Sequence, residues 1–238
     1  MSRVMRVVVM AALLVIAYGS AAQADIIFCP ESSGTAACDP NGTTGNPDEN
    51  LLFNDEDSGV VLEGVTVTGR TNTTDTLIDI TDLDGEELAV QTSGGGSGGQ
   101  AKVTGDDDGS FSNILLSAQD PTIGFTEFEA NLLVVEGSGT VTVTITNQFG
   151  ATEVGTYEVD EAGQNFFNLL AYNDQLIKSI EIEAEDGLLL SFIEQIRLGG
   201  VSEITENGAE PAALLLFGTA LVAGGRRLRR RLSVPVTA

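Results

Sequence analysis

One short segment of the chain, residues 140–146, alternates strictly between threonine and a β-branched apolar residue. Successive side chains of a β-strand point to opposite faces of its sheet. Val141, Val143 and Ile145 would therefore share one face, and the threonines between them would share the other. The segment predicts a strand in a sheet that has one buried face and one solvated face.

Much of the chain between residues 60 and 200 repeats this rhythm. Turn-forming residues recur at roughly ten-residue spacing, and helical periodicity is almost absent. Further strands are expected at residues 77–80, 88–90, 111–116, 125–135, 156–159, 166–172, 176–184 and 188–198. The pattern predicts an all-β domain at residues 60–200, a β-sandwich of jelly-roll-like form.

Two segments between residues 60 and 200 give definite expectations about burial. Ile180 and Ile182 should point into the core, with glutamates between them in solvent. Val61, Val65 and Val67 are separated by even numbers of residues, with a glycine between the first two, and should share one face of a strand. Each expectation follows from the two-residue repeat of a strand.

The charge of the chain limits its chemistry. It has 35 acidic and 11 basic residues, a formal net charge of −24, and no histidine. Without imidazole, Ser-His-Asp catalysis and His-ligated zinc are excluded. Such a negative chain would repel a phosphate backbone, so we expect no nucleic-acid partner. Adhesion, scaffolding, cation binding and carboxylate-based catalysis remain.

The N-terminus has the order of a secretory signal peptide. Arg3 and Arg6 precede an apolar run at 7–17, and small residues end at Ala24. We expect signal peptidase to remove residues 1–24 and leave Asp25 as the new N-terminus. The alternative is a retained anchor, but an apolar core of about eleven residues is short for a membrane span.

The C-terminal segment, residues 209–238, begins with a short motif, Ala209-Glu210-Pro211, and continues with an apolar stretch at 212–225. A helix over that stretch would be roughly 21 Å long at about 1.5 Å per residue. Snorkelling cations would extend it to a short transmembrane helix. The cations form one cluster at 226–231: Arg226, Arg227, Arg229, Arg230 and Arg231. They belong on the cytoplasmic side, which places the rest of the chain outside.

This motif, apolar helix and arginine cluster resemble the PEP-CTERM sorting signal of Gram-negative bacteria that make extracellular polysaccharide. The resemblance implies that an inner-membrane exosortase processes the chain near Glu210 and Pro211. It also implies export across the inner membrane, a membrane-anchored precursor, and then the cell surface or the extracellular (biofilm) matrix. An ordinary single-span tail anchor is the alternative.

The ectodomain between these segments is more acidic than the whole chain. Residues 25–208 hold 34 acidic residues against four basic ones, a net charge of −30. The basic residues are Arg70, Lys102, Lys178 and Arg197. Divalent cations would relieve the self-repulsion of such a domain.

An acidic, loop-rich segment at 25–59 contains both cysteines, Cys29 and Cys38. In an oxidising compartment we expect them to form a disulfide that contributes roughly 2.5 to 3 kcal/mol. A redox or metal pair is the alternative, but the Cys-x-x-Cys spacing is missing. Residues 201–208 are expected to be a linker.

Three acidic clusters are candidate calcium sites, because calcium takes six to eight oxygen ligands from carboxylates and carbonyls. The alternative for each is a solvated acidic loop. The candidate ligands are Asp55, Asp57, Asp82, Asp84, Glu86, Asp106, Asp107 and Asp108.

Carboxylate-based glycan hydrolysis is the enzymatic alternative. Glu127, Glu129, Glu181 and Glu183 could line a sheet face in pairs. Residues 25–208 have no tryptophan and few tyrosines to stack on sugars, so we expect no enzyme.

The rhythm of residues 124–199 loosely resembles jelly-roll domains that look like carbohydrate-binding modules. That resemblance implies a non-enzymatic protein that binds extracellular polysaccharide, with calcium assisting. The alternative is a structural surface protein whose exposed strand edges pair with other copies of itself.

Overall fold

The computed structural model describes residues 26–29, 47–54, 59–91, 101–106, 109–161 and 165–205. Within these ranges every regular element is a β-strand, and the residues up to Ile204 belong to one compact unit. The strands are β1 (Ile26–Cys29), β2 (Glu49–Leu52), β3 (Glu63–Gly64), β4 (Thr66–Thr71), β5 (Leu77–Asp82), β6 (Leu88–Gln91), β7 (Lys102–Gly105), β8 (Asn113–Ala118), β9 (Ile123–Gly124), β10 (Glu127–Val134), β11 (Ser138–Asn147), β12 (Thr152–Asp160), β13 (Asn165–Ala171), β14 (Ile177–Ala184), β15 (Leu190–Gly199) and β16 (Ser202–Glu203).

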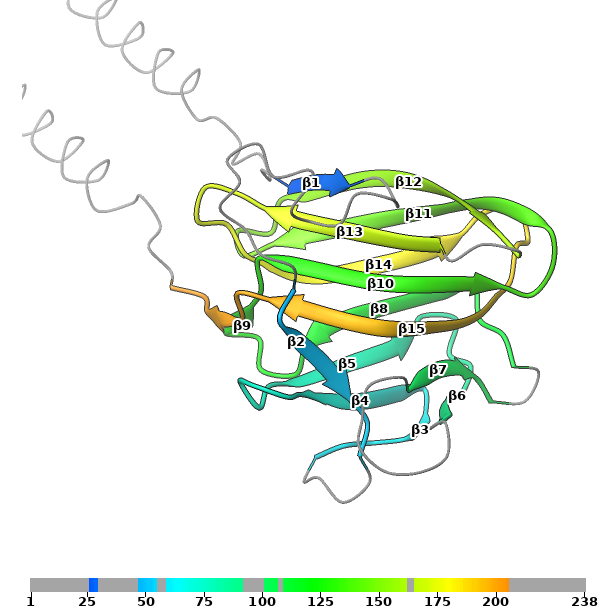
Figure 1. Cartoon of the computed structure of the whole chain (residues 1–238), viewed down its shortest axis with the longest axis horizontal. Coiled ribbons are helices and arrows are strands. Elements are labelled where there is room, and N and C mark those ends of the chain that lie inside the picture. The colour runs from blue at the N-terminus through cyan, green and yellow to red at the C-terminus, as the bar shows by residue number, and fades with distance from the viewer. Residues whose placement is uncertain are drawn as a thin grey trace, which may run out of the picture. The chain divides into compact units, whose positions relative to one another are not determined.

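The strands pack as two layers (Figure 1). Sheet A has the order β1-β13-β10-β15, and β7, β6 and β3 continue it from β15. Sheet B has the order β4-β5-β8-β14-β11-β12. Strand β2 pairs with β15 of sheet A and with β4 of sheet B, so it joins the two layers. All of these pairings are antiparallel, and β9 and β16 form a separate small pair.

The core lies between the two sheets. Sheet B contributes alternate residues of its strands, such as Val143 and Ile182, and sheet A contributes larger ones, such as Phe128 and Leu169. Each of these side chains is almost completely buried. Burial of one such side chain stabilises the fold by about 1.5–3 kcal/mol. The core therefore depends on both layers.

A row of aromatic rings fills one end of the core. Phe128 lies 5.5 Å from Phe167, and Phe167 lies 5.4 Å from Tyr157, measured between ring centroids. Burial raises the pKa of the Tyr157 hydroxyl well above its ordinary value. Phe28 of β1 packs across Gly155, where an added Cβ would lie 2.4 Å from its ring. The glycine in the middle of β12 is therefore required by the close approach of sheet A.

The all-β sandwich predicted from the sequence is confirmed. Strand β11 covers the alternating segment, and Val141, Val143 and Ile145 are fully buried. Ile180 and Ile182 are buried as well. The expected strands all appear, although β12 begins at Thr152, four residues before its predicted start. Phe111 precedes β8 as an isolated bridge to Leu190.

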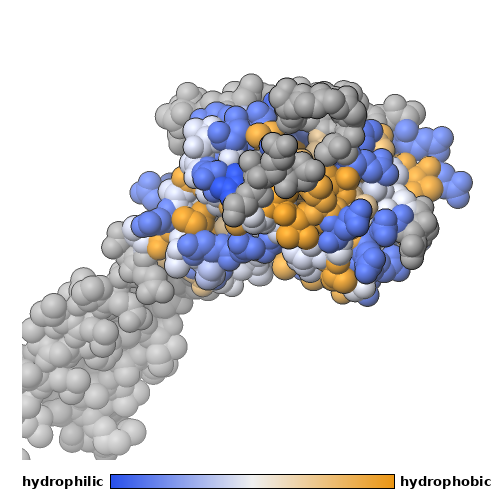
Figure 2. Space-filling model, turned by 90° about the horizontal axis from the view of Figure 1, so that it is seen from below, coloured by the Kyte–Doolittle hydropathy of each residue, from blue (hydrophilic) through white to orange (hydrophobic). Residues whose placement is uncertain are grey.

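One burial prediction is wrong. Val67 is buried, but Val61 and Val65 are 42% and 40% exposed. Gly64 has a positive φ of 129°, and the chain changes direction there between β3 and β4. The alternation of side chains between the two faces is therefore interrupted at Gly64. Figure 2 views the lower end of the molecule, where Figure 1 places β3, and shows apolar side chains at the surface there.

The sandwich is also longer than residues 60–200. Strands β1 and β2 lie in the segment expected to be loop-rich, yet β1 pairs with β13 and β2 joins the two sheets. At the other end, β16 lies in the expected linker and pairs with β9. Both differences arise because four-residue and two-residue strands carry too little periodicity to be recognised.

Candidate functional site: the outer face of sheet A

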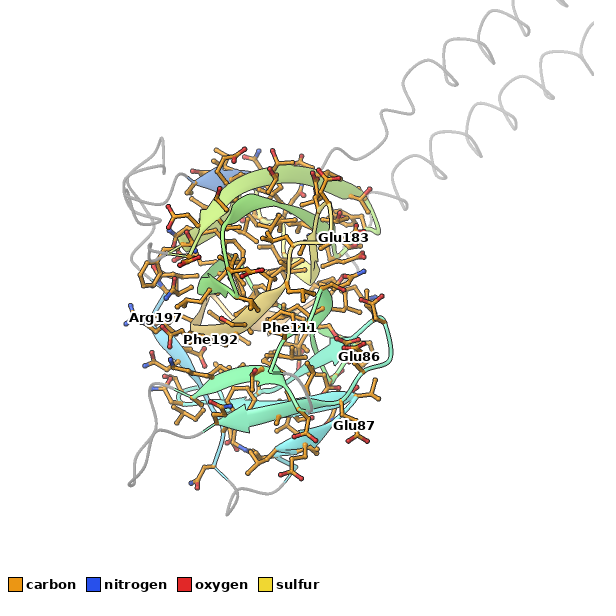
Figure 3. The ribbon with its side chains drawn as sticks, turned by 90° about the vertical axis from the view of Figure 1, so that its right-hand side faces the viewer. Glu86, Glu87, Phe111, Glu183, Phe192 and Arg197 are labelled. Carbon is orange, nitrogen blue, oxygen red and sulfur yellow. The ribbon has the colours of Figure 1, made fainter. Side chains whose placement is uncertain are left out.

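The outer face of sheet A gathers side chains of several kinds around strand β15. We call this surface the mixed-charge face. Figure 3 shows Arg197 and Phe192 on one side of the sandwich and Glu183 on the opposite side. The mixed-charge face comprises Lys102 of β7, Glu129 and Asn131 of β10, and Phe192, Glu194, Gln195 and Arg197 of β15.

Two irregularities in the pairing of β15 with β10 create this face. The register shifts once opposite Glu129 and Asn131, and again opposite Leu133 and Val134. As a result the first three buried residues of β15 are three apart, at Leu190, Ile193 and Ile196, whereas Leu198 follows at the ordinary spacing of two. A regular strand would bury every second residue. Between Leu190 and Ile196 the bulges leave two residues between successive core positions, so this face carries more side chains than a regular strand allows.

Gln195 occupies the bulge opposite Glu129 and Asn131, where its backbone lies in the left-handed region with a φ of 53°. This conformation costs a residue other than glycine about 1–3 kcal/mol, and such strain gathers at functional sites. The Gln195 side chain is half-buried, and its Nε2 lies 3.5 Å from Glu194 Oε1. The bulge therefore places Glu194 and Gln195 next to each other on the solvent side.

Two ion pairs cross the mixed-charge face. Arg197 Nη1 lies 3.3 Å from Glu129 Oε1, and Lys102 Nζ lies 3.4 Å from Glu194 Oε2. The side chains of Arg197 and Lys102 are 41% and 35% exposed, whereas those of Glu129 and Glu194 are 14% and 13% exposed. The carboxylates thus lie deeper than the cations that neutralise them.

Aromatic and amide groups complete the face. Lys102 Nζ lies 3.8 Å from the centroid of the Phe192 ring, a cation–π contact. Asn131 Nδ2 donates a hydrogen bond of 3.0 Å to Glu194 Oε1. Asn131 and Asn168 are buried, and the side-chain oxygen of each has no hydrogen-bond partner among the described residues. Burying an acceptor without a hydrogen-bond donor costs free energy, because the acceptor loses its hydrogen bonds to water.

The outer face of sheet B has a different composition. Cross-strand register aligns Thr144 with Glu181 and Thr142 with Glu183. Threonine hydroxyls and carboxylates therefore form regular rows there. Among the four glutamates considered for hydrolysis, Glu181 and Glu183 lie on this face, whereas Glu127 and Glu129 lie on sheet A. The fold does not bring the four together on one sheet.

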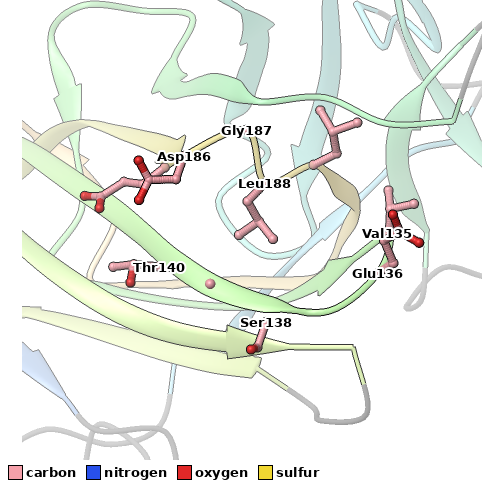
Figure 4. A pocket seen from close by; sticks show the side chains of 10 residues that line it. Val135, Glu136, Ser138, Thr140, Asp186, Gly187 and Leu188 are labelled. Atoms are coloured by element: carbon pink, nitrogen blue, oxygen red, sulfur yellow. The ribbon is translucent and has the colours of Figure 1, made fainter.

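A pocket of about 400 Å³ lies at the rim between two turns (Figure 4). The turn from β10 to β11 forms one wall, and the turn from β14 to β15 forms the other. Val135 and Leu189, both exposed, are joined by a backbone hydrogen bond of 2.9 Å. The other lining groups include the carboxylates of Glu136, Glu185 and Asp186.

The candidate calcium ligands are only partly within the described residues. Asp82 is buried, and its Oδ1 accepts hydrogen bonds from the backbone N–H groups of Asp84 and Glu86, at 2.8 and 3.1 Å. Asp82 thus caps a turn. Asp106 is exposed. Within the described ranges no group of three or more acidic or cysteine residues is placed to hold a metal ion. The other candidates, Asp55, Asp57, Asp107 and Asp108, lie outside those ranges.

Most of the predicted targeting residues also lie outside the described ranges. Cys29 is buried at the end of β1, but Cys38 falls outside, so the disulfide stays a prediction. The described part of the chain contains no helix apolar and long enough to span a bilayer. The signal cleavage site and the sorting signal also lie outside: Ala24, Asp25, Ala209, Glu210, Pro211, Arg226, Arg227, Arg229, Arg230 and Arg231.

Sequence reasoning missed the mixed-charge face. In the sequence, Lys102 and Arg197 stand out only as two of the four basic residues of the ectodomain. The available signal was the spacing of three between Leu190, Ile193 and Ile196, which departs from strict alternation. That spacing is typical of a strand interrupted by bulges.

Comparison with known proteins finds similarity among solved structures. No protein-family model matches the chain, and no curated protein matches it. Among solved structures, the chain is similar to a family 11 carbohydrate-binding module from Clostridium thermocellum, in complex with a β-1,3-1,4-mixed-linked tetrasaccharide. The identity is 13%, the match covers 63% of this chain and 96% of that one, and the TM-score is 0.32. A likeness at this level identifies no ligand.

The fold and the mixed-charge face together define the class of this chain. It is an all-β sandwich protein in which one outer sheet face carries paired charges, amides and an aromatic ring.

Proposed function

We propose that the chain is a non-enzymatic binding module for polysaccharide and that the mixed-charge face holds the glycan. The observation that supports this most directly is that one sheet face carries the Arg197–Glu129 and Lys102–Glu194 ion pairs together with the Phe192 ring. A sugar presents hydroxyl groups that both donate and accept hydrogen bonds, together with an apolar edge. Binding sites that fix such ligands combine apolar surface with a few well-placed polar groups.

Each residue has a role in this proposal. Arg197 offers a planar fork of N–H donors to neighbouring hydroxyls. Glu129 and Glu194 accept hydrogen bonds from hydroxyls at their carboxylate oxygens. Phe192 supplies apolar surface and holds Lys102 in place through the cation–π contact. The ion pairs fix these side chains before a ligand arrives, which lowers the entropy lost on binding.

Affinity electrophoresis and calorimetry of the full-length protein with a panel of neutral polysaccharides would test the proposal. We expect at least one polymer to bind, and Arg197→Ala to weaken binding about tenfold or more, since one lost charged hydrogen bond is worth roughly 1.5–3 kcal/mol. Glu183→Gln on sheet B is the matched control and should bind normally. No binding to any polymer would contradict the proposal, as would release of sugar fragments.

The location of the protein is part of the same proposal. We infer an exported protein of a Gram-negative bacterium, anchored first by residues 212–225 and processed by exosortase near Glu210 and Pro211. Replacement of Glu210 and Pro211 by alanine should then leave the protein in the membrane fraction. Unchanged release would contradict exosortase processing and favour an ordinary anchor.

Calcium assistance also belongs to this proposal. The charge of −30 on residues 25–208 supports it, because divalent ions would reduce self-repulsion. Glycan affinity measured with calcium and again with a chelator would test it. Equal glycan affinity with calcium and with the chelator would contradict calcium assistance.

Self-association is a second candidate function. Strand β12 ends the strand order of sheet B and is nine residues long, with Val154 61% exposed. Long terminal strands are sites where further chains can add to a sheet. Sedimentation of the full-length protein with calcium but without glycan would show polymers if this function holds.

A further inference from the structure

Every cation on the mixed-charge face already has a carboxylate partner on the same face. Arg197 is paired with Glu129, and Lys102 with Glu194. From this pairing we infer that the face selects uncharged glycans and rejects glycans that carry carboxylate groups. This inference rests on the proposed function, and it specifies the chemical class of the ligand.

A ligand carboxylate would have to take a cation from its present partner. If it took Arg197, then Glu129, only 14% exposed, would keep its negative charge without a counterion. The same holds for Glu194, at 13% exposed, if Lys102 moved to the ligand. Leaving a largely buried charge unpaired is strongly unfavourable. The exchange would also bring a third negative charge next to two others.

A hydroxyl group needs no such exchange. The Arg197 guanidinium has five N–H donors and the Lys102 ammonium has three, so each can serve its carboxylate and a ligand oxygen together. Both cations are more exposed than their partners, so these donors reach solvent. A sugar hydroxyl can also donate to a carboxylate oxygen. Uncharged sugar therefore fits the face with both ion pairs intact.

The charge around the face acts in the same direction. Residues 25–208 contain 34 acidic and four basic residues, and two of those four are the cations already paired here. The surrounding potential is therefore negative and opposes the approach of an acidic polymer. Screening limits this effect to about 8 Å at physiological salt, so the local pairing decides most of the selectivity.

Matched polymers would test the inference on the full-length protein. Each neutral polysaccharide is compared with the same polymer oxidised at its primary hydroxyls to carboxylates, in physiological salt with a chelator present. Acidic polysaccharides are compared with their carboxyl-reduced forms. We expect the uncharged member of each bound pair to bind at least tenfold more tightly. Equal or tighter binding of the acidic member would overturn the inference while leaving the proposed function intact. Failure of every polymer to bind would overturn both.

Two charge-removing variants make the test specific to the pairing. Glu129→Gln together with Glu194→Gln frees both cations and should shift the neutral-to-acidic preference at least tenfold toward the acidic polymer. Glu181→Gln together with Glu183→Gln removes the same charge from sheet B and should leave the preference unchanged. If both variants shift it equally, net charge rather than pairing sets the selectivity, and the inference is wrong. Circular dichroism checks the fold, and Glu129→Gln alone serves if the double variant unfolds.

Discussion

The two outer faces of the sandwich are built by opposite means. On sheet B the strands pair without interruption through their central rows, so Thr144 of β11 faces Glu181 of β14 and short polar side chains form regular rows. On sheet A, β15 bulges twice, and longer side chains form ion pairs across the strands. The regular face follows directly from alternation. The bulged face departs from alternation at the place where charged, amide and aromatic side chains lie together. Such departures from local sequence rules are common at functional sites.

The largest expected effect tests whether both faces share one core. Ile145 lies in regular β11 and Ile196 in bulged β15, and both are buried. Replacing either by alanine should lower the free energy of unfolding by about 2–5 kcal/mol, because each leaves a cavity. Denaturant unfolding measures this. A loss below about 1 kcal/mol for Ile196→Ala would mean that the bulge at Gln195 does not turn this residue inward.

The ion pair between Arg197 and Glu129 should contribute more to the free energy of unfolding than an exposed ion pair elsewhere. Arg197→Met would leave the deeper Glu129 unpaired and cost about 1–2 kcal/mol, a value reduced because Arg197 is partly exposed. Asp75, paired with Arg70, is 74% exposed, and Asp75→Asn should cost about 1 kcal/mol or less. Unfolding measurements at low and high salt compare the two. Equal losses would contradict the account of the mixed-charge face.

Glycine should be the more stable replacement at a position on sheet A, and valine the more stable replacement at a position on sheet B. At Gln195, φ is 53°, so Gln195→Gly should be tolerated and Gln195→Val should cost roughly 1–2 kcal/mol. At Thr144, in a regular strand, valine should be nearly neutral and glycine should cost about 1 kcal/mol. Unfolding free energies of the four variants give the ranking. The same ranking at both positions would argue against a left-handed Gln195.

How much of this could be predicted from sequence differs between the faces. In β11 and β14 the burial of Val143 and Ile182 can be predicted from the alternating sequence, because a strand with one buried face must alternate apolar and polar residues. The mixed-charge face needs more. Glu129 and Arg197 are 68 positions apart, and only the register of β10 with β15 brings them together. That register depends on where the bulges fall, which local patterns do not fix.

The smallest expected effect concerns a turn that leaves sheet B. Asp120, two residues after the end of β8, has its pKa lowered first by the side-chain hydrogen bond from Thr122 and then by the backbone one. A lowered pKa stabilises the fold above the unfolded-state value, and that contribution is lost as pH falls through the folded-state value. Thr122→Val should raise the pKa of Asp120 and weaken this acid dependence. A carboxyl NMR titration measures it, and an unchanged pKa would contradict the assignment.

The most direct test of the central claim is to map where a neutral glycan binds. Backbone amide NMR shifts of the full-length protein, followed during titration with an oligosaccharide of the best-binding neutral polymer, report this site. We predict the largest shifts at Lys102 and along Phe192 to Arg197. Shifts centred on Thr142, Thr144 and Glu181 of sheet B, or on the rim pocket at Leu188, would contradict it.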